Sequence, residues 1–344
     1  MKAVQIHKFG GLESLSWEDV SDPQCSPHKV LLQIKAASIN HLDIWVRIGV
    51  FPNLVLPHIP GSDGSGVIVD VGSEVNGWSA GDDVMIQPGT YCSDCRFCLE
   101  SKENYCLNYG ILGETENGTH CELMVLNPSQ IVKKPSEISF EEAAAFPLVF
   151  LTAYGMLIRR AKIEKDETIL ILGAGSGIGS AAIQIAKLKG CTVIATAGSE
   201  EKLKLAKELN ADFTINHSKE IIHDKVKEIT GGKGVDVVVE HVGESTWESS
   251  LKSLGRGGRI VTCGATTGPT VKIDLRHLFM KQQSILGSSM GDATGFCEVV
   301  SWLEDGKIKP IVDRTFLMSH VQDAHEYIEN RKQFGKVVLV NDFS

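Results

Sequence analysis

Apolar residues follow two different patterns along this chain. In the first third, short apolar runs at Val30–Ile34, Gly66–Val71 and Glu122–Val125 are separated by clusters of Gly, Pro, Ser, Asn and Asp. Such runs are typical of β-strands joined by turns. Many short strands with glycine-containing turns predict a β-barrel or a β-sandwich for this part of the chain.

The pattern changes near residue 140, where a helical stretch begins at Phe140 behind the capping residue Ser139. From Thr168 onward, apolar runs alternate with amphipathic helices until the rhythm ends near Ser288. We expect strands at 169–172, 192–196, 235–239 and 259–263, and helices at 178–189 and 200–209. This alternation predicts a parallel sheet with helices on both faces.

The length of 344 residues allows two domains of ordinary size. We therefore expect an α/β protein in which a β-rich domain comprises residues 1–149 and 289–344. The parallel-sheet domain is expected between them, at residues 150–288.

Composition and charge exclude several classes of protein. Hydrophobic residues make up 42% and charged residues 22% of the chain, as in ordinary globular proteins. The formal net charge of −9 argues against a nucleic-acid-binding protein, and no Lys/Arg-rich run indicates a membrane surface. Because the N-terminus lacks an apolar signal region, and the apolar stretches at 143–158 and 168–186 are short or interrupted, we expect a cytoplasmic protein.

A glycine-rich segment follows the strand expected at 169–172 and leads directly into a helix. Glycines let the backbone turn sharply and approach a pyrophosphate, and the helix N-terminus adds free N–H groups. The sequence departs from a strict G-x-G-x-x-G, but its place between strand and helix predicts a dinucleotide site. Its expected cofactor contacts are Gly173, Gly175, Ser176, Gly177, Ile178 and Gly179.

The tip of the next strand bears on the choice of nucleotide. Sites for NAD usually place Asp or Glu there, whereas this strand ends in Ala197-Gly198-Ser199. A small hydroxyl at Ser199 leaves room for a 2′-phosphate, with which Lys202 could pair, and His217 is expected nearby. We therefore expect NADPH rather than NADH, with a solvated helix lysine as the alternative interpretation of Lys202.

Four of the nine cysteines are closely spaced, at Cys92, Cys95, Cys98 and Cys106. Four thiolates in a polar loop suit a closed, tetrahedral, structural zinc site, with about one zinc ion per subunit. Free thiols or disulfides are the alternatives. The lobe that carries these cysteines is expected at residues 88–110.

These features together resemble the medium-chain dehydrogenase/reductase superfamily, which includes zinc alcohol dehydrogenases and quinone oxidoreductases. The resemblance covers the whole chain: the segments 61–67, 71–72 and 81–84 resemble the family's N-terminal signature, and the glycine-rich loop resembles its nucleotide domain. It implies a Rossmann-type sheet domain plus a GroES-like barrel domain that carries the cysteine lobe.

The departures from the family pattern concern the catalytic metal. Zinc alcohol dehydrogenases carry Cys-His-x-Asp where this chain has Asn40-His41-Leu42-Asp43, Gly-His-Glu where it has Gly61-Ser62-Asp63, and a third ligand near Leu148. Asn, Ser and Leu side chains do not make a strong catalytic zinc site. An improvised site from Asp63, Asp43 and His58 is the alternative.

The segment that begins at Asn40 resembles the zinc-free quinone oxidoreductases, in which the Asn and the Asp line the cleft. We expect Asn40, Asp43 and Trp45 to be the catalytic residues: a polar contact, an orienting carboxylate and a pocket wall. The competing interpretations are a local turn contact, a structural carboxylate bonded to backbone or Arg47, and a core aromatic residue. His41 is expected to contact the cofactor or a neighbour rather than to act as a base, with a structural histidine as the alternative.

The resemblance implies further cofactor contacts at Thr152, Val242, Gly264, Ser288 and Lys336. It also implies a homodimer or homotetramer formed through an edge strand. Without a metal, the site suits hydride transfer from NADPH to a quinone or an α,β-unsaturated carbonyl compound. The alternatives are a zinc-containing alcohol dehydrogenase and a nucleotide-binding sensor or structural protein without turnover.

Overall fold

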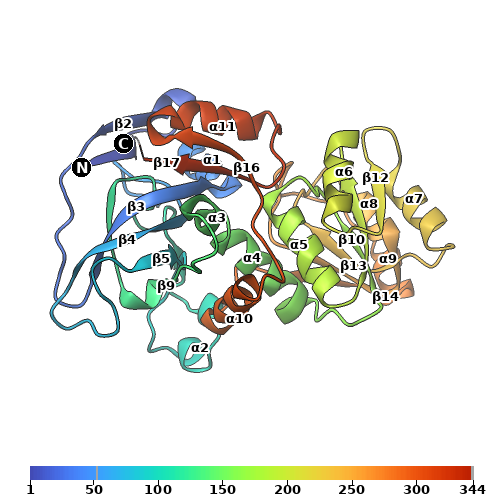
Figure 1. Ribbon diagram of the computed structural model, residues 1–344. Coiled ribbons are helices and arrows are strands. Elements are labelled where there is room, and N and C mark those ends of the chain that lie inside the picture. Colours follow the sequence, from blue (N-terminus) through green and yellow to red (C-terminus); the bar gives the residue numbers. More distant parts are fainter. Residues whose placement is uncertain (52, 342–344) are drawn as a thin grey trace. The chain divides into compact units, whose positions relative to one another are not determined.

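The computed structural model describes residues 1–51 and 53–341, and these residues divide into two compact units. The first unit comprises Met1–Leu148 and the chain from Lys309 onward, and the second comprises Val149–Ile308. Figure 1 shows the elements of both units.

The first unit is built on a seven-stranded sheet in the order β16-β17-β3-β4-β5-β9, with β8 also paired to β3. Its neighbours β1 and β2 form a separate antiparallel pair, as do β6 and β7. The strands are β1 (Lys2–Ile6), β2 (Leu15–Asp19), β3 (Val30–Ile39), β4 (Asp63–Val71), β5 (Asp83–Ile86), β6 (Gly89–Thr90), β7 (Gly110–Ile111), β8 (Leu123–Leu126), β9 (Ile131–Lys133), β16 (Val312–Leu317) and β17 (Lys336–Val340).

Short helices complete this unit. They are α1 (His41–Ile48), α2 (Arg96–Leu99), α3 (Phe140–Ala144) and α11 (Val321–Glu329), with single 3₁₀ turns at 12–14, 103–105, 128–130 and 318–320. The Ser139 cap is confirmed, since its hydroxyl accepts the Glu142 N–H at 3.2 Å. The strand expected at 30–34 is confirmed as part of β3, in whose first half buried residues alternate with half-buried ones.

The second unit contains a six-stranded, wholly parallel sheet in the order β12-β11-β10-β13-β14-β15. Counted along the chain this is the order 3-2-1-4-5-6, which is the dinucleotide-binding topology. The strands are β10 (Thr168–Ile171), β11 (Thr192–Ala197), β12 (Phe213–Asn216), β13 (Val235–Glu240), β14 (Leu254–Thr262) and β15 (Ser284–Gly287). The expected Rossmann-type sheet is therefore confirmed.

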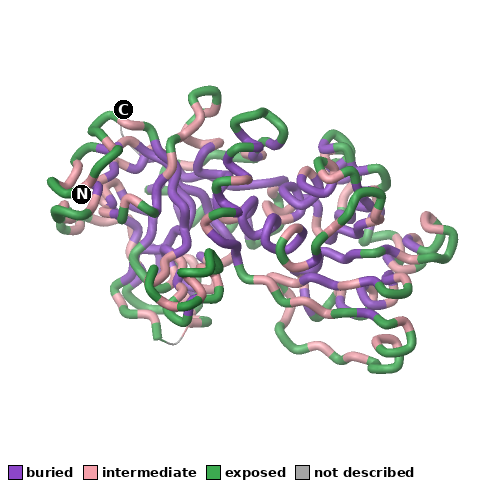
Figure 2. The backbone as a smooth tube through the Cα atoms, turned by 90° about the horizontal axis from the view of Figure 1, so that it is seen from below, coloured by how far each residue is buried: buried purple, intermediate pink, exposed green. Residues whose placement is uncertain are grey.

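Helices α5 to α9 lie around this sheet in Figure 1. Its inner strands β10, β11 and β13 are almost entirely buried, and Figure 2 colours buried segments purple. The helices are α5 (Gly177–Leu188), α6 (Glu200–Glu208), α7 (Ile222–Ile229), α8 (Trp247–Ser253), α9 (Leu275–Met280) and α10 (Ala293–Glu304). Helix α4 (Pro147–Tyr154) runs from the first unit into the second and continues as a π-helical turn at Gly155–Arg160.

Two boundaries differ from those expected. β14 begins at Leu254 rather than at residue 259, with a register shift against β13; the glycines of this segment interrupt the apolar run and hide its first half. Residues 289–308, expected in the first unit, belong to the second. The reason is that α10 is attached there: the Tyr154 hydroxyl donates to Glu298 Oε2 at 2.6 Å and Arg159 Nε to Asp292 Oδ2 at 2.8 Å.

Candidate active site and nucleotide-binding edge

The register of three strands brings together polar side chains that are far apart in the sequence. β3 pairs with β4 so that Ser38 lies opposite Asp63, and with β17 so that Ile39 lies opposite Val337, next to Lys336. Asn40 follows β3 directly and is the N-cap residue of α1. The end of β3 therefore collects a carboxylate, an ammonium group, a hydroxyl and an amide in the first unit.

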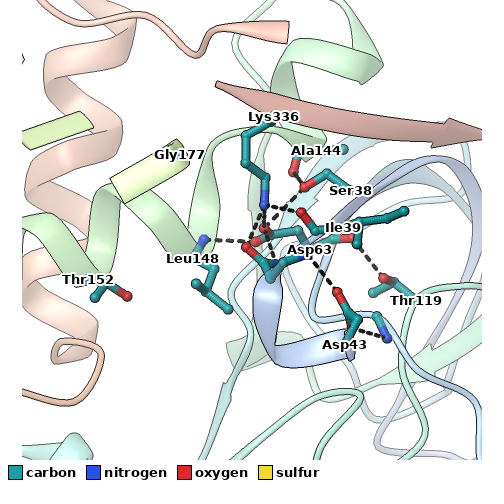
Figure 3. Close-up of polar contacts among 12 residues, drawn as sticks. Ser38, Ile39, Asp43, Asp63, Thr119, Ala144, Leu148, Thr152, Gly177 and Lys336 are labelled. Carbon is teal, nitrogen blue, oxygen red and sulfur yellow. Dashed lines mark hydrogen bonds and ion pairs between the residues drawn. The ribbon is translucent and has the colours of Figure 1, made fainter. Parts of the chain in front are cut away.

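Asp63 is the centre of this cluster and is fully buried (Figure 3). Its Oδ2 accepts from Asn40 Nδ2 at 2.9 Å and from Lys336 Nζ at 3.1 Å, and Ser38 Oγ lies 3.2 Å away. Its Oδ1 accepts the backbone N–H of Leu148, at the start of α4, at 2.8 Å. Both oxygens of the Asp63 carboxylate thus accept hydrogen bonds, and one of the donors, the Lys336 ammonium group, is a cation.

The sequence placed Lys336 among the cofactor contacts, but the structure places its ammonium group inside this cluster. The side chain of Lys336 is 4% exposed. Its Nζ donates to Ile39 O at 2.9 Å, to Asn40 Oδ1 and to Asp63 Oδ2. An ammonium group has three donors, and all three have acceptors here.

Asp43 serves the backbone. It is fully buried, and its carboxylate accepts the N–H of Asn40 at 2.7 Å and that of Gly61 at 2.9 Å. Burial raises the pKa of Asp43 to about 7, against the two backbone donors that favour the charged form. These contacts match the structural interpretation of Asp43, but its partner is not Arg47, which instead pairs with Glu329 at 2.6 Å.

Trp45 and His41 lie on the same helix, one turn apart. Trp45 is half-buried, and its ring meets the His41 ring edge-on with centroids 5.2 Å apart. Trp45 is not part of the core cluster of this unit. Its proposed place in the pocket wall stays a prediction.

Two buried histidines beside the cluster were not found from the sequence. His120 and His325 are both fully buried. Burial, together with the positive charge of Lys336, lowers the pKa of His120 to about 3. Burial also lowers the pKa of His325, with the nearby His120 and Arg47 acting in the same direction. Neither lies in a recognisable motif, so no sequence signal identifies them.

The donor set at the positions where zinc alcohol dehydrogenases carry their catalytic ligands does not suit a zinc ion. Asn40, Ser62 and Leu148 stand where the ligands would be, and Asp63 is already bound to the Lys336 ammonium group. His58 is bound elsewhere: its Nε2–H donates to Gly113 O at 2.9 Å. Over the described residues, the cysteine cluster is the one group of three or more His, Cys, Asp or Glu side chains that could hold a metal ion.

The four-cysteine cluster has the geometry of a zinc site. Cys92, Cys95, Cys98 and Cys106 have all four sulfurs within 4.8 Å of one another. Individual Sγ–Sγ distances are 3.4, 3.6 and 3.9 Å. Tetrahedral Zn–S bonds of about 2.3 Å place sulfurs about 3.8 Å apart, whereas a disulfide needs about 2.05 Å. The residues therefore fit a structural zinc ion, and the lobe is closed by the β6–β7 pair.

In the second unit, the glycine-rich loop joins β10 to α5. Ser176 caps α5, since its Oγ accepts the Gly179 N–H at 2.8 Å. Gly173 has φ +58°, and a Cβ at Gly179 would lie 2.3 Å from Gly173 O. The loop thus requires glycine at both positions, and it leaves the first N–H groups of a twelve-residue helix at the carboxyl edge of the sheet.

The tip of β11 is small, as the sequence indicated. Ser199 caps α6, and its Oγ accepts the Lys202 N–H at 3.3 Å. A Cβ at Gly198 would lie 3.1 Å from His217 Nε2, so His217 is next to the tip. The first acidic residue after it, Glu200, is bound to Asn216 Nδ2 at 2.7 Å and to Lys219 Nζ at 2.9 Å.

The remaining predicted cofactor residues follow other strands of this sheet. Val242 and Gly264 come shortly after β13 and β14, and Ser288 follows β15, with its N–H bonded to Thr262 O at 2.8 Å. Ligands of open parallel sheets bind at these carboxyl ends. Thr152 is on α4 and is 5% exposed, with Oγ1 3.4 Å from Met290 Sδ. The cofactor roles of all these residues stay predictions.

Among the described residues, no helix has both the length and the apolar character needed to cross a bilayer.

Comparison with known proteins covers both units. The family model of the alcohol dehydrogenase GroES-like domain matches residues 26–136, and that of the zinc-binding dehydrogenase matches residues 177–305.

Similar proteins match over nearly the whole chain. An NAD-dependent alcohol dehydrogenase of Sulfolobus acidocaldarius is 32% identical, with 98% of this chain and 99% of the relative covered. The quinone oxidoreductase of Homo sapiens is 29% identical, with 99% and 98% covered. A crystal structure of an NAD-dependent alcohol dehydrogenase superimposes with a TM-score of 0.96 at 44% identity, with 99% of each chain covered.

Proposed function

The chain belongs to the medium-chain dehydrogenase/reductase superfamily and is an NAD(P)H-dependent oxidoreductase, and we propose that it transfers hydride from NADPH to a quinone or an α,β-unsaturated carbonyl compound at a site without a catalytic metal. The observation that carries this proposal is the polar cluster around Asp63. It combines a buried cation with an amide group that has one donor to spare.

Asn40 is the residue proposed to contact the acceptor. Its side chain is 7% exposed and accepts from Lys336 on Oδ1. Its Nδ2 has two N–H donors, of which one goes to Asp63. A cation bound to the amide oxygen polarises the amide and strengthens donation by the second N–H. This N–H is suited to the oxygen on which negative charge develops as hydride arrives at a conjugated carbon.

The nicotinamide cofactor supplies the hydride when bound, and the chain supplies its positioning. The loop Gly173–Gly179 and the N-terminus of α5 would bind the pyrophosphate. Val242, Gly264, Ser288 and Thr152 are proposed to line the remainder of the site. The proton that completes the reduced product comes from water.

In this proposal Lys336 has the charge that a metal ion has in other members of the family. Its ammonium group neutralises Asp63 and polarises Asn40, so the cluster is electrically balanced without a further cation. Asp43 holds the N-terminus of α1, and therefore Asn40, through the Asn40 and Gly61 N–H groups. We propose Trp45 as a wall of the pocket.

Zinc is proposed at Cys92, Cys95, Cys98 and Cys106 alone, in a structural role. Four thiolates leave no open coordination position for substrate. A reducing compartment keeps such thiolates available to zinc, which favours the cytoplasm as the location. Zinc would stabilise the lobe and take no part in hydride transfer.

NADPH is proposed over NADH on the strength of the β11 tip. Ser199 is small, His217 is adjacent, and the carboxylate of Glu200 is already engaged by Asn216 and Lys219. Replacing Lys202 with alanine should weaken NADPH binding and leave NADH binding unchanged, as measured by nucleotide fluorescence. Lys204→Ala, an exposed lysine on the same helix, is the matched control. Tighter binding of NADH than NADPH to the wild type would contradict this preference.

A second copy of the chain is the proposed partner, in a homodimer or homotetramer. β15 is an edge strand, with hydrogen-bonding groups open to another strand. The nearby helix α9 exposes Leu275, Phe279 and Met280, each at least 64% exposed. Three large apolar side chains exposed together on one short helix are typical of a protein interface.

The proposed activity is tested by following loss of NADPH absorbance with a panel of quinones, enals and enones. Asn40→Ala should lower kcat for the accepted compounds by about a hundredfold and leave NADPH affinity unchanged, because the lost donor acts on the developing charge. Asn330→Ala, an exposed residue of the same unit, is the control. Equal activity of wild type and Asn40→Ala would refute the role of Asn40, and no turnover with any acceptor would favour the nucleotide-binding sensor.

Oxidation of an alcohol is the second candidate, because an alcohol dehydrogenase structure is 44% identical to this chain. The same preparation is therefore assayed with NAD⁺ or NADP⁺ and primary and secondary alcohols. Turnover that depends on an added divalent metal would favour this candidate over the metal-free reductase.

A further inference from the structure

A buried carboxylate in the second unit has no part in the chemistry described so far. Glu240 is the last residue of β13 and is fully buried. Within residues 1–51 and 53–341 it has no ion-pair partner; every hydrogen-bond donor to it is neutral. Burying a charge without a counter-ion costs free energy, so the presence of a carboxylate at this position needs a physical reason.

The donors to Glu240 come from the turn that follows β13. Oε1 accepts the N–H of Val242 at 2.7 Å and that of Gly243 at 3.0 Å. Oε2 accepts the hydroxyls of Thr246 at 2.9 Å and Ser250 at 2.6 Å. The carboxylate therefore fixes the 242–246 turn, in which Gly243 has φ +94°.

This turn is bound in its own right to the loop after β14. Val242 O accepts the Thr267 N–H and the Thr267 hydroxyl, each at 2.8 Å, and the Glu244 N–H donates to Gly268 O at 3.2 Å. A Cβ at Gly243 would lie 2.6 Å from Gly268 O, so the two loops are in close contact. Glu240 thus fixes the turn that carries Val242, and this turn contacts the loop that follows Gly264.

We propose that Glu240 is a positioning residue that also adjusts the balance between the oxidised and the reduced nicotinamide cofactor. The inference rests on the proposed cofactor contact at Val242. The N–H of Val242 donates to Glu240 Oε1 at 2.7 Å, so the negative charge lies directly behind that contact. The nicotinamide ring is positively charged when oxidised and neutral when reduced. If the nicotinamide ring binds at Val242, a buried anion behind that residue would favour the oxidised, positively charged form over the neutral, reduced form.

The test compares the binding of NADP⁺ and NADPH to the purified full chain by calorimetry. Glu240→Gln keeps the size and the acceptor for the Val242 and Gly243 N–H groups but removes the charge. It should weaken NADP⁺ binding about three- to tenfold and leave NADPH binding unchanged, as expected for one unit charge at an intermediate effective dielectric. Glu244→Gln is the matched control, because Glu244 is an exposed glutamate of the same turn. Its charge is screened by solvent, so its removal should change the affinity for neither NADP⁺ nor NADPH.

Ser250→Ala gives an independent test of opposite sign. It keeps the carboxylate and removes a donor that screens it, so binding should shift toward NADP⁺. Equal weakening of both nucleotides in Glu240→Gln, or no change in either, would overturn the proposal, as would a shift toward NADPH in Ser250→Ala. If the wild type binds neither NADP(H) nor NAD(H), it is the proposed function that fails.

Discussion

The ion pair between Lys336 and Asp63 gives the sharpest prediction for stability. Lys336→Met keeps the length of the side chain and removes its charge. Asp63, which is fully buried, would then keep its donors from Asn40 and Leu148 but lose its one cation. Breaking a buried pair from one side costs about 3–5 kcal/mol, because the remaining charge is desolvated and uncompensated.

The magnitude is measured by urea unfolding, followed through the first unit's tryptophans Trp17, Trp45 and Trp78. The double variant Lys336→Met/Asp63→Asn removes both charges. It should recover about 2–3 kcal/mol of the loss, since an amide at position 63 can still accept the Leu148 N–H.

A loss of unfolding free energy below about 1 kcal/mol in Lys336→Met, or full additivity in the double variant, would refute the description of this cluster as a tightly coupled pair.

Two further predictions concern acid stability and the nucleotide loop. The pKa of His120 is lowered from 6.5 to about 3 in the folded protein. Its contribution to the free energy of unfolding is therefore complete above pH 6.5 and is lost as pH falls, by about 2 kcal/mol at pH 5. His120→Leu should reduce the loss of unfolding free energy between pH 7.5 and pH 5 by that amount. Asp43, whose raised pKa acts in the opposite direction, is present in both proteins and does not affect the comparison. If His120→Leu and wild type lose the same unfolding free energy over this pH range, the neutral, buried state of His120 is contradicted. Gly179→Ala should displace the glycine-rich loop at a cost of about 1–3 kcal/mol and weaken nucleotide binding. Gly287→Ala is the control, because a Cβ there has no atom within 4 Å, and it should do neither. Equal nucleotide affinity in the two variants would contradict the close approach of position 179 to Gly173 O.

The parts of the fold that depend on local pattern could be predicted from the sequence. The strand at 169–172, the glycine-rich loop and the helix after it are adjacent in the chain, and their order alone indicates a parallel sheet with a nucleotide edge. The cysteine lobe is similar, because the spacing of Cys92 to Cys106 nearly specifies its geometry. Each of these features requires only short-range information.

The central pair could not be predicted in the same way. Asp63 and Lys336 are 273 residues apart, and they meet only because β4 and β17 both pair with β3. The sequence therefore placed Lys336 at the cofactor and Asp63 only in an alternative metal site. Glu240 was missed for a related reason: a glutamate at the end of an apolar strand looks like a solvent-facing residue until the following turn is seen to fold back on it.

The central claim is that hydride transfer takes place beside Asn40 without a metal ion and that zinc binds only the cysteine lobe. Metal analysis of the protein as purified, together with reductase turnover in the same sample, tests this most directly. We expect about one zinc ion per chain in the wild type, and about none in Cys106→Ser with NADPH binding retained. About two zinc ions per chain, with loss of turnover when the second is removed, would contradict it.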